Sequence, residues 1–589
     1  MASCTIDGRT VRVPEGTSVL EAAARAGIDI PTLCHHEDLD PLGSCGMCVV
    51  EIEGERAPKR ACITQVQDGM SIATSTPRLR RRRRNLLELV LAAHPHDCLH
   101  CIRHGKCELQ DLAETLEVRE LHYDEHTRGL PVDTSSLSVV RDMNKCIGCG
   151  RCVQICNEVQ TARAIQFQGR GSATVVAPAG EGMAGGVCTN CGQCVVYCPV
   201  GALHEREDID RAWTAIDDPQ RTVVAQIAPA VRVALGEEFG MEPGELVIGQ
   251  IYGALKALGV DVVLDTNFSA DLTIMEEGTE FLQRVGAGGP LPLITSCSPG
   301  WIKFGETYFP DLLENVSTCK SPQQMLGALI KTTYAERREI DPSRIVSLSV
   351  MPCTAKKYEA ARPEMEDSGF RDVDVVLTTR ELARMIREAG IDFQQVEVLP
   401  PDPVLSAYSG AATIFGASGG VMEAALRTAY EVSTGKRLDR LDLTDVRGME
   451  GVKTATVDLD GTPINVAVAS GLGNARELLE AVAAAKRAGE LPYHFVEIMA
   501  CRGGCVGGGG QPLENTLAKR AERIQGLYRE DEGLPLRRSH ENPEVQALYR
   551  EYLGEPGGER SHHLLHTYYT PRSAYVVERS RRTPVRAPA

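Results

Sequence analysis

Two runs of cysteines within residues 137–207 share one spacing. They are Cys146, Cys149, Cys152 and Cys156, and then Cys188, Cys191, Cys194 and Cys198, with Pro199 after the last. Thiolates two residues apart are common iron–sulfur ligands, and this repeated run predicts two 4Fe–4S clusters. In this pattern the fourth cysteine of each run binds the cluster of the other run. We therefore expect one cluster on Cys146, Cys149, Cys152 and Cys198, and the other on Cys188, Cys191, Cys194 and Cys156.

A further set of cysteines lies near the N-terminus. It comprises Cys34, Cys45, Cys48 and Cys62. The segment from Gly43 to Cys48 allows a tight loop whose backbone N–H groups can bond to sulfur. The wide outer spacings and the β-rich surroundings favour a 2Fe–2S cluster, with a structural zinc ion as the alternative.

A third set combines imidazole with thiolates in the stretch HPHDCLHCIRHGKCELQ, which contains Cys98, Cys101 and Cys107. One histidine and three cysteines can hold a 4Fe–4S cubane. A neutral imidazole in place of a thiolate removes one negative charge, which should raise the potential of the cluster. The histidines in reach are His94, His96, His100 and His104. A zinc ion on three cysteines and one histidine is the alternative.

Three later loops carry four of the remaining cysteines. They read TSCSPGW from Thr295, MPCTAKKYE from Met351 and MACRGGCVGGG from Met499. Each follows an apolar run, which places it at a strand end, where open α/β sheets form ligand sites. The glycines of the third loop let the backbone approach a large cofactor closely.

The elements that must position these residues differ along the chain. Residues 1–77 alternate short β-like runs with one helix-like run, which predicts a small α+β domain. From about residue 220, apolar strand-like runs alternate with helix-like stretches, which predicts α/β layers with mostly parallel sheet. The basic run from Arg78 to Arg84 is interpreted as the solvated start of a helix.

The composition limits the classes of function. A chain of 589 residues is too long for one core, so several domains are expected. The formal net charge of −17 argues against a nucleic-acid partner. The start MASCTIDGRT does not resemble a secretion signal, and no run of 18 apolar residues predicts a membrane span. With 21 cysteines mostly at metal-site spacing, the chain is expected in a reducing cytoplasm.

Taken together, these motifs resemble the iron-only (FeFe) hydrogenases over nearly the whole chain. The N-terminal set of Cys34, Cys45, Cys48 and Cys62 also resembles the 2Fe–2S ferredoxin domain of the large iron–sulfur subunit of respiratory complex I. The histidine-containing set resembles the His-ligated 4Fe–4S segment of the same subunit. The three-residue gap from His94 to Cys98 matches the pattern of these families and selects His94 as the ligand. The resemblance implies an NAD(P)-linked, multisubunit type.

The resemblance also implies an active site, the H-cluster, in which a 4Fe–4S cubane is bridged by one cysteine to a di-iron centre with CO and CN⁻ ligands. Cys353 and Cys501 would ligate the cubane, and Cys505 would ligate it and form the bridge. Lys356 would hydrogen-bond a cyanide, and Met351 and Met499 would pack beside the di-iron centre. The proton route would consist of Cys297 as final donor, followed by Glu277, Ser317 and Glu280.

One position departs from the family pattern. The family usually has a second cysteine as the fourth cubane ligand where this chain has Ser298. Ser298 would then bind iron through oxygen, a harder ligand that lowers the potential of the cubane. In a second account Cys297 becomes the ligand and is lost as proton donor. In a third, the cofactor binds poorly and the chain is not a competent hydrogenase.

The predicted fold class is multidomain α+β and α/β, with ferredoxin-like iron–sulfur domains before an α/β catalytic domain that has two lobes of mostly parallel sheet. The expected segments are a 2Fe–2S domain (1–77), a His-ligated 4Fe–4S segment (78–118), a two-cluster domain (137–207), a catalytic domain (220–515), a helical region like the family's small subunit (516–570) that wraps around the main domain, and a mobile tail (571–589).

The leading hypothesis is an enzyme that interconverts H2 with protons and electrons. It would use one 2Fe–2S cluster and three accessory 4Fe–4S clusters as an electron relay to the H-cluster. Its expected partners are an NAD(P)H-binding flavoprotein subunit, a small 2Fe–2S subunit, ferredoxin and maturation factors. The alternatives are an electron-transfer subunit with a silent site, a complex I-like subunit, which the three later loops oppose, and a hydrogen sensor, for which no output domain is evident.

Overall fold

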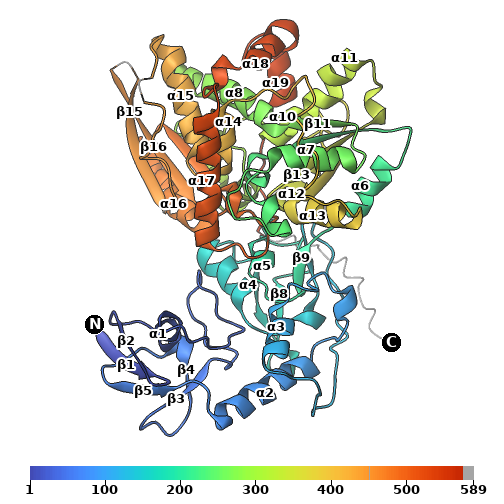
Figure 1. Ribbon diagram of the computed structural model, residues 1–589. Helices are drawn as coiled ribbons and strands as arrows, with labels where there is room; N and C mark the ends of the chain where they lie inside the picture. The colour runs from blue at the N-terminus through green and yellow to red at the C-terminus, as the bar shows by residue number, and fades with distance from the viewer. Residues whose placement is uncertain (439, 450, 460, 575–589) are drawn as a thin grey trace, which may run out of the picture.

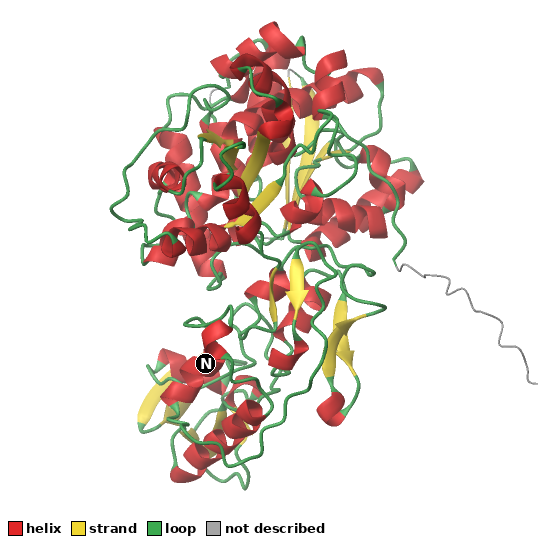
Figure 2. Cartoon of the chain, turned by 90° about the vertical axis from the view of Figure 1, so that its right-hand side faces the viewer, coloured by secondary structure: helices red, strands yellow, loops and turns green. Residues whose placement is uncertain are grey.

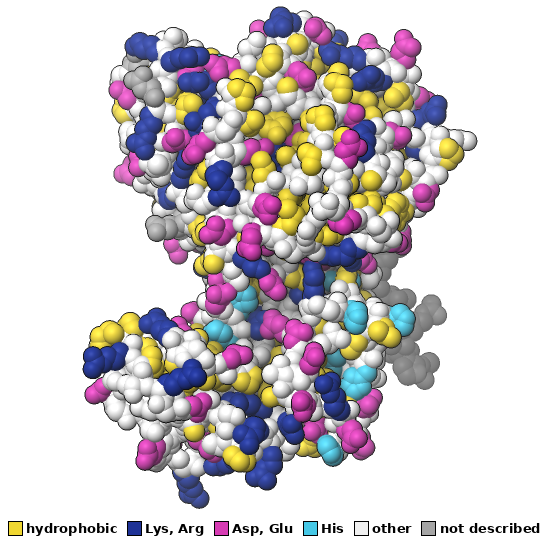
Figure 3. Space-filling view, viewed as in Figure 1, with side chains coloured by type: hydrophobic (Ala, Val, Ile, Leu, Met, Phe, Trp, Pro, Cys, Tyr) yellow, Lys and Arg dark blue, Asp and Glu magenta, His cyan; other side chains and the backbone are white. Residues whose placement is uncertain are grey.

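The chain folds into a smaller N-terminal part and a larger C-terminal part, which meet at a narrow waist (Figures 1 and 3). We call them the cluster-binding part and the catalytic part after the roles predicted from the sequence. The computed structural model describes residues 1–438, 440–449, 451–459 and 461–574. The predicted tail therefore lies outside the described residues from position 575 onward.

The N-terminal domain is a five-stranded sheet with one helix packed on it. The strand order is β2-β1-β5-β3-β4. Ser18 and Glu21 form a capping box at the start of α1, whose apolar residues share a core with the strands. The bounds are β1 (Ala2–Ile6), β2 (Arg9–Val13), α1 (Val19–Arg25), β3 (Val49–Ile52), β4 (Lys59–Arg60) and β5 (Met70–Ala73).

The basic run does begin a helix, α2 (Pro77–Ala92), with Pro77 in its first turn and Thr76 as N-cap. The expectation of a solvated run is wrong for Arg83, which is only 5% exposed. Its guanidinium donates to the carbonyl oxygens of Met47 at 3.0 Å and Val49 at 2.8 Å. A buried arginine thus ties α2 to the loop that carries the N-terminal cysteines.

The rest of the cluster-binding part consists of short elements. Two small antiparallel sheets, β6 with β9 and β7 with β8, surround the helical turns that carry the cysteine runs. The bounds are α3 (Glu108–Thr115), β6 (Val139–Arg141), α4 (Arg151–Gln154), β7 (Ile165–Gln168), β8 (Val175–Pro178), α5 (Gln193–Val196) and β9 (Leu203–Glu205).

The catalytic part contains two four-stranded sheets enclosed by helices (Figure 2). In the first, ordered β11-β10-β13-β14, all pairs are parallel. In the second, ordered β12-β17-β16-β15, only the β15–β16 pair is antiparallel. The predicted two lobes of mostly parallel sheet are confirmed. The strands are β10 (Thr222–Ile227), β11 (Val262–Asp265), β12 (Leu293–Ile294), β13 (Ile345–Met351), β14 (Val375–Thr378), β15 (Val452–Leu459), β16 (Thr462–Ser470) and β17 (Phe495–Met499).

Helix α8 joins the two lobes. Phe268 and Leu272 pack into the core behind the first sheet, whereas Ile274 and Phe281 pack into that of the second. The helices of the catalytic part are α6 (Ile209–Ile216), α7 (Ile248–Ala257), α8 (Thr266–Ala287), α9 (Pro299–Tyr308), α10 (Pro322–Leu329), α11 (Ala335–Arg338), α12 (Ala355–Ala360), α13 (Thr379–Glu388), α14 (Gly410–Thr413), α15 (Gly420–Thr434) and α16 (Leu472–Ala488). Among the described residues, no helix is long and apolar enough to cross a membrane.

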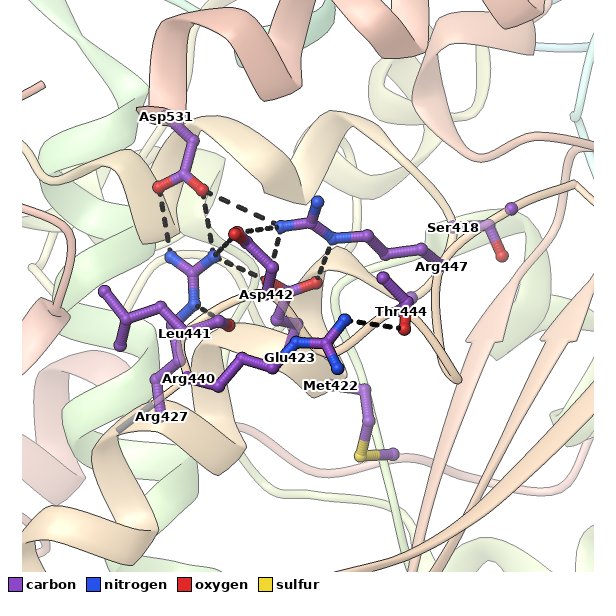
Figure 4. A network of polar contacts seen from close by, with 12 residues as sticks. Ser418, Met422, Glu423, Arg427, Arg440, Leu441, Asp442, Thr444, Arg447 and Asp531 are labelled. Atoms are coloured by element: carbon purple, nitrogen blue, oxygen red, sulfur yellow. Dashed lines mark hydrogen bonds and ion pairs between the residues drawn. The ribbon is translucent and has the colours of Figure 1, made fainter. Parts of the chain in front are cut away.

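The C-terminal helices α17 (Leu517–Gly533), α18 (Pro543–Leu548) and α19 (Glu559–Leu565) lie on the catalytic part. A buried network of arginines and carboxylates fastens α17 to α15 (Figure 4). Arg427 forms a bidentate pair with Asp531 at 2.9 and 3.0 Å and also contacts Glu423 at 2.5 Å. Arg447 pairs with Glu423 at 2.7 Å and Asp442 at 2.8 Å. The network holds the C-terminal region because each buried charge has partners.

Replacing Arg427 with methionine leaves Asp531 and Glu423 with a buried, partly uncompensated charge. We expect the free energy of unfolding of the catalytic part to fall by about 3–5 kcal/mol. Urea denaturation followed by the fluorescence of Trp213 and Trp301, which both pack in this part, measures the change.

The matched control is Arg437→Met, since Arg437 is 79% exposed and 3.5 Å from Glu541. That substitution should cost about 0–1 kcal/mol. Equal losses in the two variants would show that the network does not fasten α17.

Candidate functional site

The thiols of the two-cluster domain lie in two groups. Burial is the main cause that raises the pKa of Cys149 to about 12. The charge of the neighbouring Cys198 also raises it, and that of Cys146 contributes less. Burial also raises the pKa of Cys156 to about 12, with Cys191 and Cys188 among its charged neighbours. Each fourth cysteine therefore lies among the first three of the other run, which is the arrangement expected from the sequence.

The N-terminal thiols are arranged as two pairs. The Cys48 thiol donates to the sulfur of Cys62 at 3.4 Å. The backbone N–H of Cys45 donates to the sulfur of Cys34 at 3.4 Å, and a thiol hydrogen bond from Cys34 lowers the pKa of Cys45 to about 5. Two pairs of thiolates suit a cluster of two irons, because each iron takes two protein ligands.

His94 is the histidine of the third set whose surroundings suit a metal ligand. Its Nδ1 is buried and has no hydrogen-bond partner, and burial lowers its pKa to about 4, so the ring is neutral at pH 7. The rival His96 bonds the carbonyl of Leu91, and His100 bonds Asp97 at the surface. A neutral ring with an unused buried nitrogen is what a metal ion requires.

The spacing of these sets opposes a single zinc ion. A tetrahedral zinc holds thiolates at about 2.3 Å, so its ligand atoms lie within roughly 4.6 Å of one another. Among the described residues, three ligand atoms lie within 4.8 Å of one another only at places outside all the cysteine sets. The sets are therefore wide enough for clusters of several irons and too wide for one zinc ion.

The three predicted loops meet in one cavity between the lobes. The loops follow β12, β13 and β17, so all lie at carboxyl ends of strands. The lining is mostly apolar and includes every predicted residue of these loops. Those residues are Cys297, Ser298, Met351, Cys353, Lys356, Met499, Cys501 and Cys505.

Three thiols form the side of the cavity that faces the cluster-binding part. Burial is the main reason why the pKa of Cys501 lies well above its usual range. The charges of the nearby Cys353, Cys191 and Cys505 raise it further. Cys191 belongs to the two-cluster domain and also lines the cavity. Gln193, two residues later, donates to the sulfur of Cys501 at 3.3 Å and to the carbonyl of Gly507 at 2.9 Å. The two-cluster domain therefore contacts the cavity wall at Cys191 and Gln193.

This contact depends on glycines. A Cβ atom on Gly192 would lie 2.4 Å from the Thr354 hydroxyl, and one on Gly509 would lie 2.2 Å from the carbonyl oxygen of Cys191. Gly504, with φ of +93°, would place a Cβ 2.6 Å from the backbone nitrogen of Ser418. Only residues without a Cβ let these backbones approach so closely.

The polar residues of the cavity are few. The Lys356 ammonium donates to the Cys297 carbonyl at 3.2 Å and pairs with Glu359 at 2.8 Å. Met351 and Met499 are 2% exposed and end their strands at the cavity. A buried cation among apolar walls is suited to bind a small anionic ligand.

Ser298 and Cys297 point to different surroundings. The Ser298 hydroxyl accepts a hydrogen bond from the backbone N–H of Ala500 at 3.3 Å, directly beside Cys501. Burial raises the pKa of Cys297 well above its usual range, and the next causes are the charges of Glu277 and Cys505. Cys297 thus lies near Glu277, whereas the Ser298 hydroxyl lies beside Cys501.

The expected proton route is a contiguous group of side chains. Glu277 is 1% exposed and has a buried, unpartnered Oε1, and burial raises its pKa to about 8, with Glu280 as second cause. The Ser317 hydroxyl donates to Glu280 at 2.8 Å. Glu280 is paired with Arg284 at 2.5 Å near the surface. The structure therefore brings all four predicted residues together between cavity and solvent.

The sequence reasoning missed Gln193 and Cys191 as parts of the cavity wall. Gln193 lies between Cys191 and Cys194, so the sequence places it near a predicted cluster. No feature of the sequence predicts its contact with Cys501, 308 residues away. The buried Arg103, which donates to the carbonyl of Val195 at 3.0 Å, was missed as well.

Five family profiles match the chain. They are described as 2Fe–2S iron–sulfur cluster binding domain (residues 1–77), NADH-ubiquinone oxidoreductase-G iron–sulfur binding region (83–122), 4Fe–4S dicluster domain (145–202), iron only hydrogenase large subunit, C-terminal domain (221–509), and iron hydrogenase small subunit (517–572).

Curated relatives match over nearly the full length. The chain is 51% identical to the NADP-reducing hydrogenase subunit HndD of Solidesulfovibrio fructosivorans, over 97% of this chain and 99% of the relative. It is 40% identical to iron hydrogenase 1 of Clostridium pasteurianum, over 97% and 100%. Among solved structures, the apo FeFe hydrogenase of Chlamydomonas reinhardtii is 44% identical, with a TM-score of 0.56, and covers 62% of this chain and 100% of its own.

The surroundings of the histidines generate a direct test of the ligand set. We expect His94→Ala to remove one 4Fe–4S signal from the electron paramagnetic resonance spectrum of the reduced protein and to lower its iron content by about four atoms per chain. His96→Ala, the matched control, should leave both unchanged, because His96 is surface-exposed and bonds a backbone carbonyl. Loss of the signal in the control alone would assign the ligand to His96.

Proposed function

The chain belongs to the iron-only hydrogenase large-subunit family, and from that membership we propose that it interconverts H2 with protons and electrons at an H-cluster in the cavity. The single observation that carries this proposal is the meeting of Cys353, Cys501, Cys505 and Lys356 in one mostly apolar cavity. The chain is an oxidoreductase acting on hydrogen, with accessory iron–sulfur domains that relay electrons.

We assign one 2Fe–2S cluster to the N-terminal set, one 4Fe–4S cluster to His94 and its three cysteines, and two 4Fe–4S clusters to the paired runs. Each cluster carries one electron at a time, so a donor at one end never needs to touch the cavity. The Gln193 side chain, which bonds Cys501, supports electron entry from the cluster that takes Cys191.

In the cavity, Cys353, Cys501, Cys505 and Ser298 would hold the cubane, and Cys505 would bridge to the di-iron centre. When bound, the di-iron centre supplies the site where H2 is cleaved or formed. Lys356 would bind a cyanide ligand, and Met351 and Met499 would exclude water from the far side. The group fits because the thiols are buried together and the lining offers few other polar atoms.

Ser298 is the proposed fourth ligand. Its hydroxyl lies beside Cys501 and accepts from Ala500, while Cys297 faces Glu277 on the other side of the loop. An oxygen ligand is harder than a thiolate and favours the oxidised cubane, which lowers its potential. Cys297 stays available to hold and release a proton.

The proton route runs from Cys297 through Glu277 and Ser317 to Glu280. A carboxyl with a pKa of about 8 exchanges protons readily near neutral pH, which suits a group that must give and take them in both directions. The burial that raises this pKa also keeps the route separate from bulk water.

The second candidate function is an electron-transfer subunit with a silent site. Ser298 is the specific observation that favours it, because a weak fourth ligand would leave the cubane unstable. Such a chain would carry electrons through the accessory clusters without making H2.

The proposed partners are an NAD(P)H-binding flavoprotein subunit and a small 2Fe–2S subunit, with ferredoxin as a further carrier and maturation factors for the di-iron centre. The similarity to a relative named as a subunit of an NADP-reducing hydrogenase supports a multisubunit complex. The match of residues 83–122 to a region of NADH-ubiquinone oxidoreductase supports docking beside the His-ligated cluster.

Infrared spectroscopy of the anaerobically matured protein tests the function directly. We expect sharp bands of bound CO and CN⁻ that change when H2 replaces argon, in wild type and in Ser298→Cys. The thiolate in the variant should raise the potential of the cubane in a redox titration. Absence of the bands in wild type, with the accessory clusters intact, would favour the silent subunit, and their recovery only in Ser298→Cys would identify serine as the cause.

The pKa of Glu277 predicts a pH dependence of H2 formation. A carboxyl with a pKa of about 8 is protonated below that value, so proton delivery should fall about twofold by pH 8 and about tenfold by pH 9. The rate of exchange of D2 with solvent protons, measured as a function of pH, follows this alkaline decrease without net electron flow.

Glu277→Gln should lower the exchange rate by at least about 100-fold and abolish the decrease of the rate above pH 8. Glu277→Asp is the matched control, because it keeps a carboxyl and should keep an alkaline decrease at a lower rate. An unchanged pH profile in Glu277→Gln would exclude Glu277 from the route.

A further inference from the structure

A buried group of titratable side chains continues from the end of the proton route into the C-terminal helix α19. One ligand atom each of Glu280, Cys319 and His566 lies within 4.8 Å of the others. The Cys319 thiol donates to Glu280 at 3.9 Å, and Cys319 is fully buried. Cys319 belongs to none of the cysteine sets, yet it lies close to both a carboxylate and an imidazole.

His566 is held in a defined orientation. It is 6% exposed, its Nδ1 contacts the Thr318 hydroxyl at 2.7 Å, and its Nε2 contacts the carboxylate of Glu276 at 3.1 Å. Glu276 is fully buried and also accepts from Tyr549 at 2.5 Å. A carboxylate on one ring nitrogen fixes the orientation of the imidazole, as in catalytic His–Asp pairs.

His562 connects this group to solvent. Its ring stacks on that of His566, with centroids 4.5 Å apart and planes 13° apart. His562 is exposed, whereas His566 beneath it is buried. Burial lowers the pKa of His562, and the charge of His566 is the next cause, so the ring is a neutral proton acceptor at pH 7.

We propose that His566 and His562 form a proton outlet from Glu280, so that the C-terminal region completes the proton route. This inference rests on the proposed function of Glu280. During H2 oxidation, the Glu280 carboxyl gives its proton to the Cys319 sulfur as the thiol gives its own to His566. Glu280 becomes a carboxylate, the thiol is regenerated, and His566 becomes an imidazolium that passes its proton by way of His562 to water.

The charged and titratable groups around His566 come from every element packed against it. Helix α8 contributes Glu276 and Glu280, the segment after Ser317 contributes Cys319, the C-terminal region contributes Tyr549, and α19 contributes His562. His566 thus lies among two carboxylates, one thiol and a second imidazole.

Variants of the exposed ring test the outlet without disturbing the core. We expect His562→Ala to lower the H2 oxidation rate of the full chain about fivefold to tenfold at pH 7, and added imidazole to restore most of the loss. His563→Ala, at the next exposed position of the helix, is the matched control and should behave as wild type. Equal rates in the two variants, or no rescue by imidazole, would overturn the proposal.

The Cys319 step has its own matched pair. Cys319→Ser keeps an O–H group that can pass a proton, whereas Cys319→Ala removes it. We expect the alanine variant to slow D2–proton exchange and the serine variant to retain most of it. Equal exchange rates in the alanine variant and wild type would remove the thiol from the outlet.

A readout that needs no hydrogenase activity separates this inference from the proposed function. Nuclear magnetic resonance of 13C-labelled histidine in the full chain follows the titration of His566, assigned with His566→Gln. Glu280→Gln removes a negative charge within 4.8 Å of the ring and should lower the pKa of His566 by about one unit or more. An unchanged pKa of His566 would overturn the proposed coupling of Glu280 to His566. A shifted pKa in a protein without H2 activity would contradict only the proposed function.

Discussion

The approach of the glycine-rich loop to the two-cluster domain is the constraint on which the rest of the structure depends. In the proposed function, electrons cross from a cluster on Cys191 to a cubane on Cys501, and electron transfer weakens steeply with distance. Gly192 and Gly509 have no Cβ atom, so the backbone of the two-cluster domain can lie directly against that of the glycine-rich loop. The bond from Gln193 to the Cys501 sulfur then fixes the register of the two parts.

The fold around this contact serves two opposite requirements. The cavity must be dry, so that buried thiols and one lysine act in a medium of low polarity. It must also exchange protons with water. The two lobes provide the apolar surroundings, because three strand ends meet around one apolar cavity. Helix α8, which joins the lobes, solves the second by carrying Glu277 and Glu280 from the cavity toward the surface.

The C-terminal helices have a structural role that extends to chemistry. The network of Arg427, Asp531 and Glu423 fastens α17 to α15, and Glu276 fastens α19 to α8 through His566. Buried charges of this kind contribute little net stability but penalise any arrangement that separates them. The same pairing that holds α19 in place therefore sets a histidine beside the end of the carboxylate route.

The sequence by itself determined the cysteine sets, the three loops and the two-lobed α/β class, because ligand spacing and apolar periodicity are local properties. It also identified the partition of the two cysteine runs, since that pattern repeats within 53 residues. Only the tertiary structure showed the buried, unpartnered Nδ1 of His94, separated the surroundings of Cys297 and Ser298, and joined Glu276 to a histidine 290 residues away. Such contacts leave no periodic trace along the chain, because a side chain finds its partner only after distant segments have packed.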